Sequence, residues 1–288
     1  MSTAILTGLV LGSIYILVAL GYNIVFLASG AFNFAQAAVV MLGAFVASTY
    51  GVERGLPTLV VILLAALIGA VVGIATEITA IRPVVGKGLH GELVTTVGVS
   101  TILTGLIVVI WGVDIRPVNP IVSSAVVTIF SGRVTVDGLI LIAVAIVSCL
   151  GLWAWSRFTL GGLASLAVSE DRPAATLRGI NVNYLSILAT ASAGAIGGAA
   201  GVFVGTQTLA VPTIAAVLTL NSFLVLIIGG MGSFPGLLIG GLVVGILEAL
   251  TGRYLGSEYV TLMLFALLLA VLLVKPEGFF GQKVNRVV

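Results

Sequence analysis

Long apolar stretches, separated by short polar or glycine-rich segments, run through the whole chain. A membrane-spanning helix needs about 20 mostly apolar residues, and nine stretches approach or exceed that length. Glycine-rich interruptions leave open whether the second and eighth stretches are full spans or half-helices. The pattern therefore predicts an all-α, polytopic transmembrane helical bundle of about nine spans (eight to ten) with broken helices. The nine stretches cover residues 4–27, 34–50, 57–80, 93–112, 138–155, 184–205, 214–230, 235–251 and 259–274.

Composition agrees with this pattern and excludes a soluble globular protein. Hydrophobic residues make up 60% of the 288 positions and charged residues only 8%, whereas soluble domains carry roughly 25% charged residues. No polar block is long enough to form a separate soluble domain, so we expect one transmembrane domain over residues 1–288. The net charge of +2 is small and scattered, which gives no reason to expect nucleic-acid binding. The first span lacks a basic leader and is expected to be retained.

Basic residues in the short loops predict the orientation in the membrane. Lys and Arg accumulate in cytoplasmic loops, and an even number of apolar stretches separates the three basic clusters. One topology therefore places all three clusters and the C-terminus in the cytoplasm, with the N-terminus outside. The clusters are Arg82 with Lys87, then Arg157, Arg172 and Arg178, and finally Lys275, Lys283 and Arg286.

Ionisable residues are rare inside the apolar stretches. Ion-coupled carriers use buried acids, bases or His, and only Glu77 and Glu248 qualify. Each lies near a span end and five residues before an arginine, Arg82 or Arg253. We therefore expect both carboxylates to reach toward the interface, with an ion pathway as the alternative.

Neither a metal site nor a catalytic site is expected. The only histidine, His90, has no cysteine or acidic cluster beside it, although metal sites need several such ligands. Cys149 is the only cysteine and lies in an apolar run, where packing is its expected role. No combination of Ser, His and Asp suggests a hydrolase.

Hydroxyl groups repeat along one face of the fourth stretch. Thr96, Ser100 and Thr104 are spaced by four residues, which places them on one side of a helix. This face either lines a translocation path or consists of hydroxyls that bond back to their own helix carbonyls.

Amide side chains flank the break between the first two stretches. Asn23, Asn33 and Gln36 lie around residues 29–32, and unpaired amides in lipid would cost several kcal/mol each. They must therefore face protein, water or a ligand. A half-helix end beside a substrate passage fits them, as does amide bonding between helices.

Glycines recur at intervals of four residues, which lets helices approach closely in lipid. Ordinary helix packing is the main interpretation of these ladders. They comprise Gly69 and Gly73; Gly194 and Gly198; Gly197, Gly201 and Gly205; Gly236 and Gly240; and Gly241 and Gly245.

The segment 157–183 holds a concentration of charge that contrasts with the rest of the chain. Asp171 can cap a helix N-terminus, Pro173 suits the first turn, and Gly179 suits a left-handed residue after the C-terminus. These signals predict a helix of about two turns, too short to span a membrane. Such a helix suits docking on a soluble partner, and a merely solvated connector is the alternative.

Four segments together resemble a known family. GGLASLAVSEDRPAATLRGINVNYLSILATASAGAIGGAAGVF, which contains the charged segment, resembles the cytoplasmic coupling region of the inner-membrane permeases of branched-chain amino acid ABC importers. GLVLGSIYILVALGYNIVF with GAFNFAQAAVVMLGAF, IIGGMGSFPGLLIGGLVVGILEAL and VKPEGFFG resemble other parts of the same permeases, in the same order. The N-terminal form is similar to the shorter of the two permease paralogues.

The resemblance implies the ABC importer permease fold and a multi-pass protein of the bacterial inner membrane with no ATPase of its own. It implies four kinds of partner: a second related permease in a heterodimer, two ATP-binding subunits that hold the ATP, an extracytoplasmic substrate-binding protein, and the lipid bilayer. Lys87 lies in no phosphate-binding loop pattern, and the chain itself is expected to need no cofactor. The resemblance assigns ATPase coupling to Glu170, Asp171, Arg172, Ala175, Arg178 and Gly179. It assigns the translocation path to Asn33 and Gln36. The polar pattern of the spans, independent of the resemblance, adds Asn23, Thr96, Ser100 and Thr104 to this path.

One departure from the family pattern concerns the substrate. Family members commonly have an acidic residue shortly after the Asn-Phe-Ala triplet, where this chain has Ala38. The expected cargo is therefore a branched-chain amino acid or a related small polar solute such as an amide, urea or an organic acid. An ion-coupled secondary carrier, a passive small-solute channel and a structural scaffold are the alternative functions.

Overall fold

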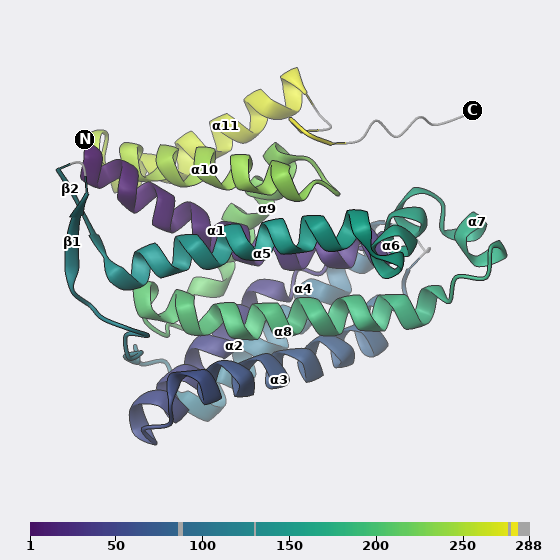
Figure 1. Cartoon of the computed structure of the whole chain (residues 1–288), viewed down its shortest axis with the longest axis horizontal. Helices are drawn as coiled ribbons and strands as arrows, with labels where there is room; N and C mark the ends of the chain where they lie inside the picture. The colour runs from purple at the N-terminus through teal and green to yellow at the C-terminus, as the bar shows by residue number, and fades with distance from the viewer. Residues whose placement is uncertain (86–88, 130, 276–277, 282–288) are drawn as a thin grey trace. The chain divides into compact units, whose positions relative to one another are not determined.

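The computed structural model is almost wholly helical (Figure 1). It describes the chain except residues 86–88, 130, 276–277 and 282–288 and the side chains of residues 89 and 90. The predictions for Lys87, the His90 side chain, Lys283 and Arg286 lie outside these described residues. The helices are α1 (Ser2–Ser29), α2 (Gln36–Val46), α3 (Thr58–Thr76), α4 (Leu89–Trp111), α5 (Val136–Phe158), α6 (Leu160–Glu170), α7 (Arg172–Leu177), α8 (Val182–Thr208), α9 (Ile214–Gly229), α10 (Phe234–Tyr254) and α11 (Val260–Val274). The π-helical segments Ala47–Glu53 and Glu77–Ile81 extend α2 and α3, and the 3-10 turn Ser257–Tyr259 precedes α11.

Eight of the described helices are long and apolar enough to cross a membrane, which lies within the predicted eight to ten. The second and eighth stretches, which the sequence left open, are both among the eight. The one stretch that is not among the eight is the seventh, 214–230, which corresponds to α9, a helix of only 16 residues. At 1.5 Å per residue it is about 24 Å long, shorter than the roughly 30 Å hydrocarbon core.

The described helices group into two compact units, each assembled from segments that are distant in the chain. The first unit contains Met1–Asn23, Val122–Ala154 and Leu220–Val288, and the second contains Ile24–Ile121 and Trp155–Thr219. Helices α1, α5 and α9 each contribute residues to both units. The single-domain organisation of residues 1–288 stays a prediction.

Helices α2, α3 and α8 form the centre of the second unit, where they lie side by side (Figure 1). Gly69 of α3 faces Gly194 of α8, and Gly43 of α2 faces Gly198 of α8. A side chain at any of these glycines would overlap the backbone of the neighbouring helix. The predicted packing role of the glycine ladders is therefore confirmed here, because small residues allow close approach where lipid gives no hydrophobic driving force.

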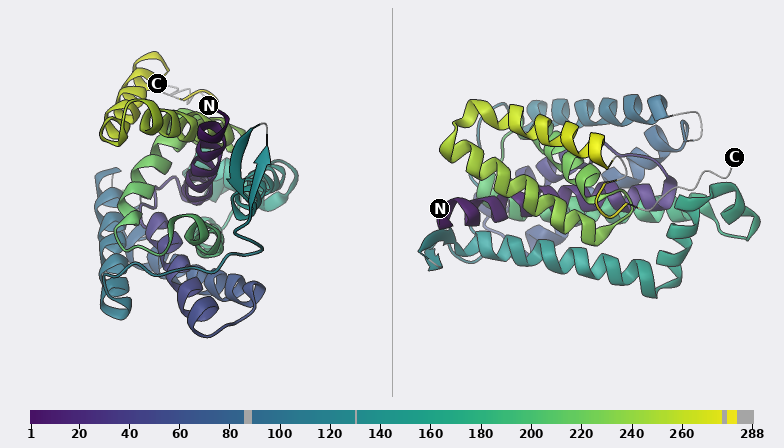
Figure 2. Two further views of the ribbon diagram at one scale, coloured as in Figure 1. Left: turned by 90° about the vertical axis from the view of Figure 1, so that its left-hand side faces the viewer. Right: turned by 90° about the horizontal axis from the view of Figure 1, so that it is seen from above.

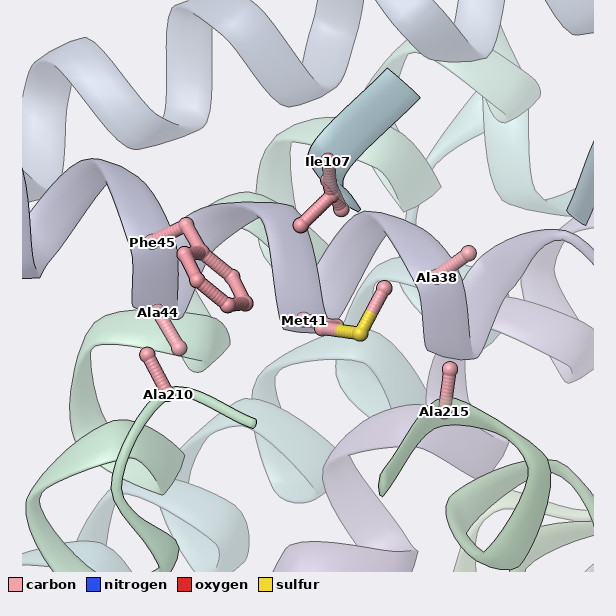
Figure 3. Packing of buried hydrophobic residues seen from close by; sticks show 7 residues of the cluster. All are labelled: Ala38, Met41, Ala44, Phe45, Ile107, Ala210 and Ala215. Carbon is pink, nitrogen blue, oxygen red and sulfur yellow. The ribbon is translucent and has the colours of Figure 1, made fainter. Parts of the chain in front are cut away.

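An apolar cluster packs against α2 in the same unit (Figure 3). Ala38, Met41 and Phe45 of α2 pack with Ile107 of α4 and with Ala215 at the start of α9. Ala38 is fully buried. A carboxylate at this position would be surrounded by apolar side chains, so the alanine suits its surroundings.

The first unit is built on a close contact between α1 and α10. Gly8 and Gly12 of α1 meet Gly245 and Gly241 of α10, with carbonyl oxygens where side chains would otherwise be. The order of these pairs shows that the two helices run antiparallel. In both orientations shown, α11 lies beside α10 (Figure 2). Cys149 is buried and its Sγ lies 2.9 Å from the Phe234 carbonyl oxygen, in agreement with a packing role.

A two-stranded ribbon precedes α5 in the first unit (Figure 2). Strands β1 (Val126–Ile129) and β2 (Gly132–Thr135) pair antiparallel, with Val127 opposite Val134. The Arg133 N–H donates to the Thr3 hydroxyl at 3.4 Å, which connects the ribbon to the start of α1. The all-helical prediction did not include this ribbon.

Candidate translocation and coupling sites

The predicted break between the first two spans is present. Helix α1 ends at Ser29, and Gly30 adopts a φ of +74°, the left-handed conformation that favours glycine. Asn33 Oδ1 accepts a hydrogen bond from the Ala35 N–H at 3.1 Å, so this amide shapes the chain that leads into α2. Because of this break, α2 begins as a separate helix in the second unit.

Gln36 is the first residue of α2 and bonds across to α8. Its Nε2 donates to the Ala193 carbonyl at 2.8 Å, and Gly197 leaves the space that the amide occupies. Gln36 Oε1 is buried and has no partner among the described residues. The structure therefore contains the amide bonding between helices that the sequence allowed. The buried Oε1 acceptor of Gln36 is not used in this bonding.

Asn23 belongs to the first unit, where it supports a different break. Its Oδ1 accepts the Gly232 N–H at 2.8 Å, and both Gly230 and Gly232 have positive φ values. Asn23 Nδ2 is buried without a partner among the described residues. The sequence grouped Asn23 with Asn33 because they are neighbours in the chain. The structure instead bonds it to the α9–α10 break.

The hydroxyl face of α4 bonds largely to its own helix. Thr96 donates to the Glu92 carbonyl at 2.7 Å and lies 3.4 Å from the Phe32 carbonyl. Thr104 donates to the Ser100 carbonyl at 2.9 Å. This is the back-bonding alternative. A back-bonded hydroxyl still has acceptor lone pairs, and the path role of this face stays a prediction.

Glu77 does not reach toward the interface. It is 2% exposed, and its Oε1 accepts the Ser186 hydroxyl at 2.6 Å. The expectation of snorkelling is wrong for Glu77, because a hydroxyl of α8 lies within hydrogen-bonding distance in the packed second unit.

Glu248 also bonds to neighbouring helices. Its Oε2 accepts the Tyr15 hydroxyl of α1 at 2.7 Å and the Asn221 Nδ2 of α9 at 3.4 Å. Arg253, the arginine five residues further along α10, lies over the Tyr254 ring. The carboxylate is thus part of a polar cluster between three helices of the first unit, which corrects the snorkelling interpretation.

The short helix predicted in the charged segment is confirmed. Helix α7 covers Arg172–Leu177, and Asp171 Oδ1 caps it by accepting the Ala174 N–H at 2.9 Å. Gly179 adopts a φ of +86° after the helix end. The preceding helix, α6, has a similar cap, in which the Thr159 hydroxyl accepts the Gly162 N–H.

The six residues assigned to coupling divide into an outer and an inner set. Ala175 is buried with Val168 and Val182 in a small core formed by α6, α7 and α8. Arg172 is half-buried, and its Nη1 donates to the Ser29 carbonyl at 3.3 Å, at the end of α1. The exposed members are Glu170, Asp171, Arg178 and Gly179, beside Leu177, which is 90% exposed. The outer set is therefore the surface available to a partner.

Within the described residues, no three His, Cys, Asp or Glu side chains come together in a way that could hold a metal ion. The polar clusters are instead small groups of hydrogen bonds between helices. Such groups can position helices and bind polar solutes.

Comparisons with known proteins cover nearly the whole chain. The family described as branched-chain amino acid transport system / permease component matches residues 4–272. The high-affinity branched-chain amino acid transport system permease protein LivH of Escherichia coli (strain K12) is 32% identical, over 96% of this chain and 94% of that protein. The corresponding protein BraD of Pseudomonas aeruginosa is 29% identical, with 96% and 95% covered. The ribose import permease protein RbsC of Haemophilus influenzae is 27% identical, with 94% and 84% covered.

Proposed function

Because the chain belongs to the family of permease components of branched-chain amino acid transport systems, we propose that it forms one half of the translocation path of an ATP-driven importer. The chain is a multi-pass permease of the bacterial inner membrane, and eight of its described helices are able to span a bilayer by length and composition. As a permease subunit, it is not itself the enzyme that hydrolyses ATP. The cargo is a branched-chain amino acid or a related small polar solute.

The continuous family match over residues 4–272 is the observation that carries this proposal. It includes both helical units and the charged segment with α7. The exposed side of α7, with Leu177 and Arg178 beside Gly179, is an accessible surface of the kind that docks in a groove on a soluble protein. We assign the coupling role to this outer set.

The partners follow from the same family membership. An importer permease works with ATP-binding subunits and a substrate-binding protein, and here we propose two of the former, which hold the ATP. A second, related permease completes the path as a heterodimer. In this chain, the path includes the two break regions, with Asn33 and Gln36 at one and Asn23 at the other, and the hydroxyl face of α4 formed by Thr96, Ser100 and Thr104.

Two observations bear on the cargo. The names of the relatives with the higher identities mention branched-chain amino acids, and the name of a more distant relative mentions ribose. Ala38 lies in an apolar cluster, so no acid is present at the position where family members commonly have one. Branched-chain amino acids are the first cargo to test, with neutral polar solutes next.

Reconstitution into liposomes tests the function directly. We expect ATP-dependent uptake of radiolabelled leucine only when this permease is combined with a related permease, two ATP-binding subunits and a leucine-loaded binding protein. The reason is that the energy enters through subunits other than this chain. The matched control uses the same assembly with an ATP-binding subunit that cannot hydrolyse ATP, and its uptake should fall to the level of empty liposomes.

Other outcomes would identify a different class of protein. Leucine uptake by the purified chain alone, driven by a proton or sodium gradient, would make it a secondary carrier. Solute flux without ATP, gradient or partner would make it a passive channel. Either result would contradict the importer assignment.

A further inference from the structure

A carboxylate inside a membrane span of the first unit has no compensating cation among the described residues. Glu248 lies six residues before the end of α10, about 9 Å from that end. Its Oε2 accepts two hydrogen bonds, from the Tyr15 hydroxyl and the Asn221 amide. The residue is only half-buried, and its Oε1 accepts no hydrogen bond from the described residues.

The helix arrangement explains why these three side chains meet. Glycine contacts hold α1 and α10 close together and antiparallel. Helical side chains lean toward the N-terminus of their own helix. Tyr15 and Glu248 therefore lean toward each other from opposite directions, and Asn221 approaches from α9. Two neutral donors fix the orientation of one carboxylate oxygen and leave the other oxygen available.

The charge balance of this cluster is incomplete. Tyr15 and Asn221 are neutral donors, and the only ion pair among the described residues joins Arg116 to Glu53 in the second unit. Arg253 is the nearest basic residue along the chain, and it lies over the Tyr254 ring instead. A carboxylate in a span is costly unless a cation or a proton neutralises it. The cluster therefore has the donors that orient a carboxylate but lacks the positive charge.

We infer that Glu248 binds the ammonium group of the transported solute, with Tyr15 and Asn221 as positioning residues. This inference rests on the proposed import of amino acids. The cation would approach the free Oε1 while the two donors hold Oε2.

Two variants of Glu248 separate a charged binding group from a structural acceptor. Glu248→Gln keeps the shape and an acceptor for Tyr15 but removes the charge, whereas Glu248→Asp keeps the charge on a shorter side chain. We expect Glu248→Gln to weaken leucine binding to the assembled importer, without binding protein, by about 10- to 100-fold, the range of a hydrogen bond to a charged group. Glu248→Asp should bind leucine more tightly than Glu248→Gln does. Equilibrium dialysis with radiolabelled leucine measures both.

Two controls accompany these variants. Glu77→Gln neutralises the buried glutamate of the second unit, which already bonds to Ser186, and should leave leucine affinity unchanged. Tyr15→Phe removes a neutral donor and keeps the charge, so we expect a smaller loss than in Glu248→Gln, about threefold.

Competition on the unaltered importer gives a test that needs no variant. We expect 3-methylbutylamine, which has an ammonium but no carboxylate, to displace leucine, and 4-methylpentanoate, which has the reverse, to be much weaker. The opposite order would overturn the inference. Unchanged leucine affinity in Glu248→Gln would also overturn the inference. So would loss of the partner permease from Glu248→Gln on size exclusion, because the cation that pairs with Glu248 would then belong to the partner permease. An importer that neither binds nor transports leucine would overturn the proposed amino-acid cargo as well, and the other failures leave that cargo standing.

Discussion

Gly198→Ala is expected to destabilise the folded permease by about 1–3 kcal/mol or more, the cost of overpacking a close-packed interior. A Cβ at this position would overlap the Ala65 carbonyl of α3, and the Gly198 carbonyl already occupies the space beside Gly43 of α2. Backbone atoms cannot turn aside as a flexible side chain can. Relief would require α8 to move away from both neighbours. Thermal unfolding of the detergent-purified protein, followed by size exclusion, measures the effect.

Gly98→Ala is the matched control for this prediction. Gly98 lies in the middle of α4, and a Cβ there would have no atom within 4 Å. Alanine favours a helix over glycine by about 1 kcal/mol, so this variant should be neutral or slightly stabilised. Equal loss of folded protein in both variants would show that close backbone contact does not decide the role of Gly198.

Gly179→Val is expected to reduce ATP-driven uptake by roughly tenfold while the protein still inserts into the membrane. The left-handed conformation costs an L-residue about 1–2 kcal/mol, and Gly179 has a φ of +86°. A Cβ at Gly179 would meet no atom within 4 Å, so the effect would come from the backbone alone. Valine would redirect the chain between α7 and α8 and displace the exposed surface around Leu177. Leucine transported per ATP hydrolysed measures the coupling.

Gly179→Asn provides the control, because asparagine tolerates the left-handed conformation better than valine does. It adds a side chain of similar size and should retain most of the coupled uptake. If asparagine and valine reduce coupling equally, bulk at the docking surface would explain the result and backbone geometry would not.

Local signals predicted much of this structure. The nine apolar stretches include all eight of the described helices that can span a membrane. Asp171, Pro173 and Gly179 predicted α7 with its cap and its left-handed end, because these features depend on neighbouring residues. Gly30 likewise marked the break after α1. The segments Val126–Ile129 and Gly132–Thr135 contain Val, Ile and Thr, residue types that favour strands, and the count of apolar stretches did not include this signal.

Contacts between distant residues could not be predicted in the same way. Tyr15 and Glu248 are 233 positions apart, and nothing near Glu248 in the chain shows that a hydroxyl of α1 will reach it. The closeness of Arg253 in sequence predicted a carboxylate that reaches the interface and gave no sign of this contact. The sequence likewise did not distinguish Ala175 and Arg172 from the other residues assigned to coupling. Packing between α6 and α8 buries Ala175, and a hydrogen bond to the Ser29 carbonyl holds Arg172.

The antiparallel contact between α1 and α10 also has a consequence for the order of synthesis. The glycines of α1 leave the ribosome more than 200 residues before their partners in α10, an interval of roughly 10 to 50 seconds at usual elongation rates. During that time the glycine face of α1 has no permanent neighbour in the bilayer. The first unit can close only when translation is nearly complete, so a chain that is truncated before α10 would leave this face open to pairing with the wrong helix.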